Sequence, residues 1–111
     1  MRTKKIVEEL YSIATGRKFN PETDAANALA MMNFLKKKHE SKVYLLIVFQ
    51  GEQREIHSIY SARMGAVIAQ QKLLKNKRKM WKRTMNTPEL KQENPFNKCY
   101  RFLIQERTLH D

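Results

Sequence analysis

Val43-Tyr44-Leu45-Leu46-Ile47-Val48-Phe49 is the longest apolar run in the chain, and it decides the fold. Seven residues are too few for an independent helix, and the β-branched and aromatic side chains favour a strand. Both alternating faces of this strand are apolar, which is typical of a central strand covered on both sides. The run is also far below the roughly 20 apolar residues that span a bilayer. We therefore expect a buried central strand and no membrane-spanning segment.

The residues after this run predict a hairpin. Gln50-Gly51-Glu52-Gln53 suits a turn, and residues 54–60 return as a second strand of mixed polarity. Residues 98–107 alternate in polarity and predict a third, half-buried strand. A helix separates the second strand from the third, so both are most easily placed beside the central strand and antiparallel to it. We expect a three-stranded sheet with 54–60 and 98–107 flanking 43–49.

Two helices are predicted before the first strand. Residues 3–14 have apolar side chains at helical spacing, with Thr3 as the cap and Gly16 as the stop. Asn20-Pro21 then begins a second helix. Its predicted apolar stripe consists of Ala25, Ala28, Leu29, Met32 and Leu35.

A third, long helix is predicted over residues 62–85, with Ser61 as its cap. Pro88 and Asn94-Pro95 predict an exit loop before the last strand. The fold class is therefore α+β, with the order α-α-β-β-α-β and the long helix crossing from the second strand to the third. We expect this helix to cover one face of the sheet and the two N-terminal helices to cover the other.

Length and composition indicate one domain. The chain has 111 residues, of which 41% are apolar and 30% are charged, enough for one small core. We interpret residues 1–111 as a single domain with a helical part, 1–40, and a ββαβ part, 41–111. Cys99 is the only cysteine, so an internal disulfide is excluded and a reducing compartment, the cytoplasm, is expected.

Positive charge is concentrated in the third helix. The net charge is +11, and residues 72–83 carry seven positive side chains and no negative one. A cationic surface of this kind suits a polyanion, either nucleic acid or an acidic protein surface. The candidate binding residues are Lys72, Lys75, Lys77, Arg78, Lys79, Lys82 and Arg83.

Six of these cations share one side of the predicted helix. At about 100° per residue they fall within an arc of roughly 140°. Lys77 lies on the apolar side, which suggests that the helix end extends past the body. The apolar side is predicted to comprise Val67, Leu73, Leu74, Met80, Trp81 and Met85. Contact with roughly 4 to 6 phosphates predicts a log-log salt slope near −4 to −5.

Other interpretations of this helix remain open. A charged face is often only solvated, but such faces usually interleave both signs. Membrane-surface and calmodulin-target segments are also basic and amphipathic, but here Trp81 and the leucine pair are needed for the core. Trp81 is thus expected to pack internally, with stacking on an unpaired base as the alternative.

The sequence indicates no metal, cofactor or catalytic centre. His39, His57, His110 and Cys99 lack the spacing of zinc ligands, and no glycine-rich loop is present to hold phosphate. Glu89-Leu90-Lys91 matches a short acidic-x-Lys element of some nucleases but falls in a predicted loop. His57 beside Arg54 could form a metal-free ribonuclease centre, although an ordinary strand histidine is commoner.

The pattern of the C-terminal part is similar to a phage protein class. The hairpin ends in Ile59-Tyr60-Ser61, a helix follows with Ala62 and Ala66, and the chain closes on Tyr100-Arg101-Phe102-Leu103-Ile104-Gln105-Glu106. In this it resembles the small ββαβ domains of unknown function common in phage genomes. The resemblance implies an accessory protein that binds nucleic acid or a host protein, rather than an enzyme. The N-terminal helices and the basic extension depart from it.

Three functions follow as hypotheses. The first is a non-enzymatic basic protein that binds nucleic acid, DNA or RNA, mostly through phosphates. The second is a protein-binding modulator or inhibitor of a host or defence enzyme that uses the same cations. The third is a small nuclease. The sequence does not determine the oligomeric state.

Overall fold

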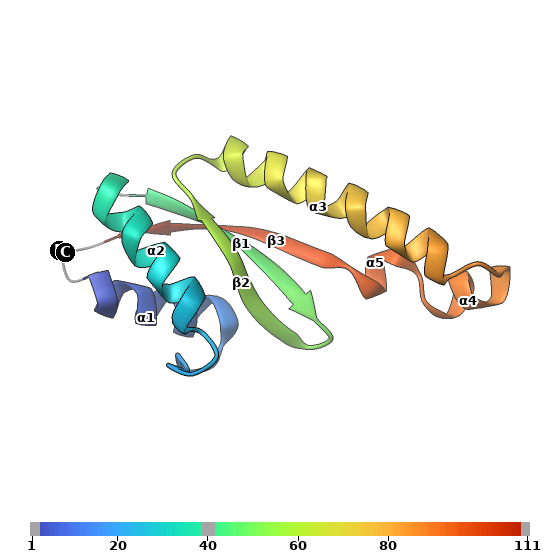
Figure 1. The fold of residues 1–111 in the computed structure, drawn as a ribbon, viewed down its shortest axis with the longest axis horizontal. Coiled ribbons are helices and arrows are strands. Elements are labelled where there is room, and N and C mark those ends of the chain that lie inside the picture. Colours follow the sequence, from blue (N-terminus) through green and yellow to red (C-terminus); the bar gives the residue numbers. More distant parts are fainter. Residues whose placement is uncertain (1–2, 39–41, 110–111) are drawn as a thin grey trace.

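The computed structural model describes residues 3–38 and 42–109 (Figure 1). Its helices and strands follow the predicted order, with two additional short helices before the last strand. They are α1 (Thr3–Thr15), α2 (Ala25–Lys38), β1 (Lys42–Gln50), β2 (Gln53–Tyr60), α3 (Arg63–Thr84), α4 (Pro88–Glu93), α5 (Phe96–Cys99) and β3 (Arg101–Thr108).

The sheet has the predicted strand order β2-β1-β3, and both pairs are antiparallel. Leu46 in the central strand lies opposite Ser58 on β2 and Ile104 on β3. The next residue, Ile47, pairs with Ile56, so His57 is an extra residue in a β-bulge. The apolar run that decides the fold is thus hydrogen-bonded along both of its edges.

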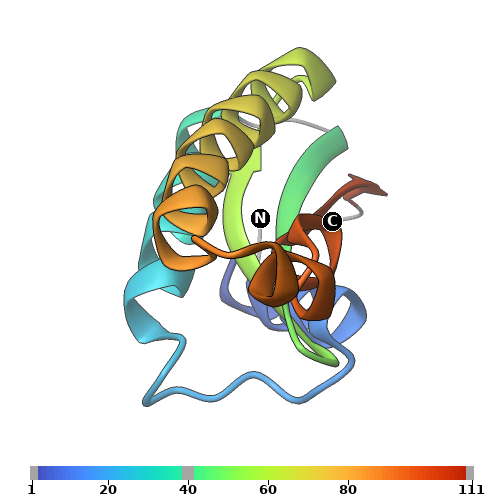
Figure 2. The ribbon, with the colours of Figure 1, turned by 90° about the vertical axis from the view of Figure 1, so that its right-hand side faces the viewer.

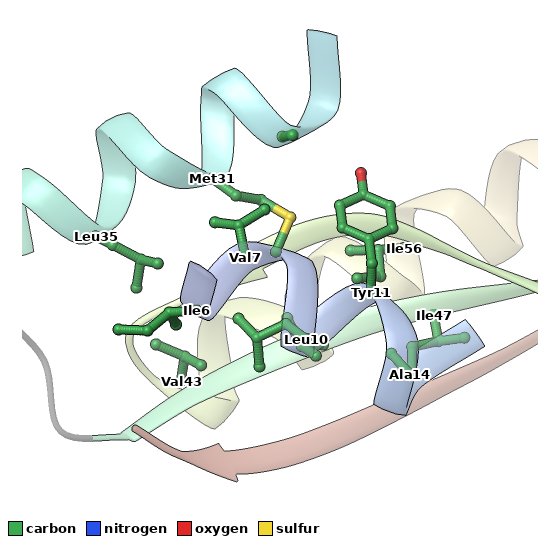
Figure 3. Close-up of a cluster of buried hydrophobic side chains, with 12 residues drawn as sticks. Ile6, Val7, Leu10, Tyr11, Ala14, Met31, Leu35, Val43, Ile47 and Ile56 are labelled. Atoms are coloured by element: carbon green, nitrogen blue, oxygen red, sulfur yellow. The ribbon is translucent and has the colours of Figure 1, made fainter. Parts of the chain in front are cut away.

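Helices cover both faces of the sheet, as predicted. Figure 2 shows α3 and α1 on opposite sides of the strands. Val43, Leu45 and Ile47 point to the side of α1 and α2 and share one buried cluster with them (Figure 3). Leu46 points the other way and is fully buried on the side that α3 crosses. This two-sided burial explains why residues 43–49 of β1 are apolar on both alternating faces.

The buried stripe of α2 differs from the prediction. Ala28, Met31 and Leu35 are buried, whereas Ala25 is exposed and Leu29 is 56% exposed. These three residues lie on the same side as Asp24, which precedes them by four, seven and eleven positions and is itself buried and bound to Arg17. In α1, likewise, Ala14 is buried and Ile13 is exposed.

Arg17 joins the α1–α2 connection to β2. Its Nη1 donates to Asp24 Oδ2 at 2.8 Å and its Nη2 donates to Glu55 Oε2 at 2.6 Å. Asp24 is only 6% exposed, and the Arg17 hydrogen bond lowers the pKa of its carboxyl below the ordinary 3.8. The bonds to Asp24 and Glu55 raise the pKa of Arg17. We name Arg17, Asp24 and Glu55 the ion triad.

Four predicted helix and loop boundaries are wrong. The second helix begins at Ala25 instead of at Asn20-Pro21, which form part of a turn. Ser61 does not cap α3: the N-cap residue is Ala62, and no side chain bonds there. The predicted exit loop contains α4, where Thr87 Oγ1 accepts from Leu90 N and Pro88 occupies the first turn. Residues 96–99 form α5, so β3 begins at Arg101 instead of 98. The predicted cap at Thr3 lies outside the described side chains.

Candidate nucleic-acid interface

The helix α3 is held at two places. Near its start, Ala66 is buried and Gly65 lies against the ring of Tyr60, where an added Cβ would sit 3.4 Å from that ring. Toward its end, α3 extends past the sheet and lies beside α4 and α5 (Figure 1). The basic segment belongs to this second half.

Five of the seven predicted cations are exposed on one side of α3. At 1.5 Å per residue, the stretch from the first to the last is about 16 Å long. Among the described residues, no carboxylate lies within 4.0 Å of any of them. We name these five the cationic row; they are Lys72, Lys75, Lys79, Lys82 and Arg83. Uncompensated charges in a single row produce a positive potential along the helix.

The other two predicted cations lie against aromatic rings. Lys77 Nζ is 5.6 Å from the centre of the Tyr100 ring, and the Arg78 guanidinium is 4.4 Å from that of Phe96. Both distances suit a cation–π interaction. Lys77 and Arg78 therefore pack against aromatic rings, and we do not count them in the cationic row. Arg78 nevertheless remains exposed.

The end of α3 is packed by a satellite aromatic cluster of Trp81, Phe96 and Tyr100. Trp81 and Phe96 meet edge to face with ring centres 6.0 Å apart, and Phe96 and Tyr100 lie 5.4 Å apart. Trp81 thus packs internally as predicted, but in this cluster and half-buried rather than in the main core. The end of α3 extends past the sheet, and α4 and α5 fold against it there.

The outer side of α3 also carries apolar residues that the sequence analysis does not single out. Met64 is 67% exposed and Ile68 is 46% exposed. Ile68 precedes Lys72 by one helical turn, so both lie on the side of the cationic row. The intervals of four residues from Met64 to Ile68 and from Ile68 to Lys72 are the signal in the sequence that places all three on one side of the helix. Met80, expected on the apolar side, is 50% exposed.

The minor catalytic candidates are dispersed. His57 Nδ1 lies 3.1 Å from Ser58 Oγ, and the neighbouring Glu55 is bound to Arg17. Glu89 and Lys91 lie on α4, where Lys91 Nζ is 5.6 Å from the Trp81 ring. In residues 3–38 and 42–109, no three His, Cys, Asp or Glu side chains are grouped as metal ligands. His39 and His110 lie outside the described residues.

In the described part of the chain, no helix has both the length and the apolar character to cross a bilayer. Comparisons with protein-family models, with curated proteins and with solved structures find no match to this chain. The candidate interface therefore rests on the exposure and the charge of the side chains of α3.

Proposed function

We propose that this protein is a small, non-enzymatic basic accessory protein of the cytoplasm that binds nucleic acid through the cationic row of α3. The supporting observation is the exposure of five like charges with no described carboxylate within 4.0 Å. A solvated face that serves only solubility would gain from interleaved acids, because neighbouring like charges on a helix repel. A polyanion relieves that repulsion.

Phosphate contact explains the chemistry of the row. Lysine ammonium groups are compact cations that bind phosphate as point charges, with little preference for a base. Binding through five phosphates releases counterions and predicts a log-log salt slope of about −3.5 to −4.5. The protein would then bind nucleic acid with little sequence preference.

The test is a salt series of binding to labelled DNA and RNA by wild type and by the triple variant Lys75→Glu, Lys79→Glu, Lys82→Glu. We expect the variant to lose binding while its melting temperature stays nearly unchanged, because these three side chains are exposed. A matched control reverses the exposed Lys4 and Lys5 of α1 and Lys18 of the connection that follows it, which changes the net charge equally. Retained affinity in the first variant, or equal loss in the control, would contradict a local interface.

Two further experiments, a pull-down after nuclease treatment and an incubation with labelled RNA or DNA, distinguish the competing functions. A modulator of a host or defence enzyme would be captured with a protein that remains bound after nuclease treatment, and the row would then face an acidic groove. A nuclease would cleave labelled RNA or DNA, in the presence or the absence of magnesium. The phage resemblance is compatible with either binding role, and the uncompensated row suits both an acidic groove and nucleic acid. We favour nucleic acid because lysines bind phosphate as point charges, with little preference for a base.

A further inference from the structure

The cationic row has a narrow angular width on α3. At about 100° per residue, Lys72, Lys75, Lys79 and Lys82 lie within an arc of about 80°, and Arg83 extends it to about 100°. One flank of the row carries Asn76 and Met80, which are uncharged. The other flank carries Gln71 and Arg78, and the Arg78 guanidinium is stacked on Phe96. The free charges thus form one line along the helix.

A single line of cations suits a single phosphate backbone. A helix inserted in the major groove contacts the phosphates of both strands from its two flanks, and directs its central side chains to base edges. Here the centre of the outer side carries lysines, one flank is uncharged, and the Arg78 guanidinium on the other flank lies over the Phe96 ring. This arrangement follows one strand.

On the same side of α3, the residues that precede the cationic row are apolar. Met64 and Ile68 fall within the same arc of about 80° and are the residues of α3 that precede Lys72 on that side. Their exposed fractions, 67% and 46%, leave most of the Met64 side chain and about half of Ile68 available for contact. Paired bases in a duplex hide their faces in the stack, whereas unpaired bases present them to apolar surfaces.

We infer that the ligand of α3 is single-stranded nucleic acid, whose phosphates lie along the cationic row and whose unpaired bases or sugars contact Met64 and Ile68. This rests on the proposed function and specifies its substrate class. The full contact from Met64 to Lys82 would be about 27 Å long. An extended strand can follow such a helix without bending.

The test measures fluorescence anisotropy of the full chain with labelled strands of about 20 nucleotides, single-stranded and duplex, of RNA and of DNA, over a range of salt. We expect the single strands to bind at least about fivefold more tightly than the duplexes at equal salt. The variant Met64→Ala/Ile68→Ala should lose about five- to tenfold in single-strand affinity at an unchanged salt slope, because it removes apolar contact only.

A matched control is Ile13→Ala/Leu29→Ala, which removes two apolar side chains that are 51% and 56% exposed on α1 and α2. It should bind single strands as wild type does. Duplex affinity equal to or above that of single strands, or wild-type affinity in the Met64/Ile68 variant, would overturn the inference and leave the proposed function standing. So would binding to phosphatidylserine vesicles that depends on Met64 and Ile68 while strand binding does not. Absence of any nucleic-acid binding by wild type would overturn both.

Discussion

The indole Nε1 of Trp81 donates a hydrogen bond to the backbone carbonyl of Asn94 at 2.8 Å. This bond joins the end of α3 to the segment between α4 and α5. The Sγ of Cys99 also approaches the Asn94 carbonyl, at 3.6 Å. The satellite aromatic cluster is thus fixed by a specific polar contact, and it supports the half of α3 that carries the cationic row.

Replacing Trp81 by Phe should keep most of the ring contact with Phe96 and lose the bond to Asn94. We expect a cost of about 1 kcal/mol in unfolding free energy, and faster hydrogen exchange of the amides in residues 88–99. Circular dichroism and exchange mass spectrometry measure the two effects. Met80→Ala, an exposed neighbour, is the control and should change neither. Unchanged exchange in Trp81→Phe would show that the bond does not hold α4 and α5.

Removing Arg17 should leave the buried Asp24 without its partner. The Arg17 side chain is 35% exposed and that of Asp24 is 7% exposed, so the loss is smaller than for a fully buried pair. We expect Arg17→Met to cost about 1 to 3 kcal/mol in urea unfolding. The free energy of unfolding of Arg17→Lys should lie between those of wild type and Arg17→Met. An ammonium group keeps the positive charge but cannot contact both carboxylates as the guanidinium does. Lys18→Met, at an exposed neighbouring position, should leave the free energy of unfolding unchanged. An equal loss of stability in Arg17→Met and Lys18→Met would exclude a role for the ion triad.

The ion triad also predicts a dependence of stability on pH. The pKa of Asp24 is lower in the folded chain than its ordinary value of 3.8, because Arg17 bonds the charged carboxylate. Folding therefore gains from deprotonation, and this gain is complete above about pH 5 and is lost as the pH falls through 3.8 toward the native pKa. Unfolding free energy measured between pH 7 and pH 3 should fall less steeply in Asp24→Asn. Glu22→Gln, an exposed carboxylate in the same connection, should follow the wild-type profile.

The sheet could be predicted from the sequence because its signal is local. The run from Val43 to Phe49 and the two flanking strands each have a distinct apolar pattern, and the α3 crossover leaves one simple antiparallel order. The stripe of α2 could not be predicted, because Ala25, Leu29 and Met32 have helical spacing as well as the buried Ala28, Met31 and Leu35, and the choice depends on which side contacts α1 and β2. No periodicity within α2 encodes that contact.

The candidate site, like the fold, could be predicted from the sequence only in part. Charge density is a local property, so residues 72–83 stand out in the sequence. Which cations remain free depends on Phe96 and Tyr100, which come after the helix and reach it only because α4 and α5 fold back. The exposure of Met64 and Ile68 could not be predicted, because apolar residues in a helix are ordinarily assigned to its buried side.

The hydroxyl of Tyr11 is buried and has no hydrogen-bond partner among residues 3–38 and 42–109. The amide of the nearby Asn27 donates instead to the Ile56 carbonyl at 2.6 Å. Tyr11→Phe should therefore be neutral or stabilising by up to about 1 kcal/mol, because an unpaired polar group leaves the core. Tyr44→Phe, on the other side of β1, is the comparison. Marked destabilisation by Tyr11→Phe would mean that the hydroxyl is hydrogen-bonded.

The seven basic residues between positions 72 and 83 of α3 should divide into two classes when they are neutralised. Lys75→Gln/Lys79→Gln removes two members of the cationic row and should reduce the magnitude of the salt slope by about 1.4 to 1.8, since each lost phosphate contact removes about 0.7 to 0.9. Lys77→Gln/Arg78→Gln removes the two cations over Tyr100 and Phe96, and should cost about 1 to 2 kcal/mol in stability with a smaller change in slope. Measuring binding against salt and unfolding against urea on both variants separates these effects. If Lys77→Gln/Arg78→Gln lowers the slope as much as the first variant and leaves stability intact, its side chains bind the polyanion, and the division between the row and the aromatic contacts is wrong.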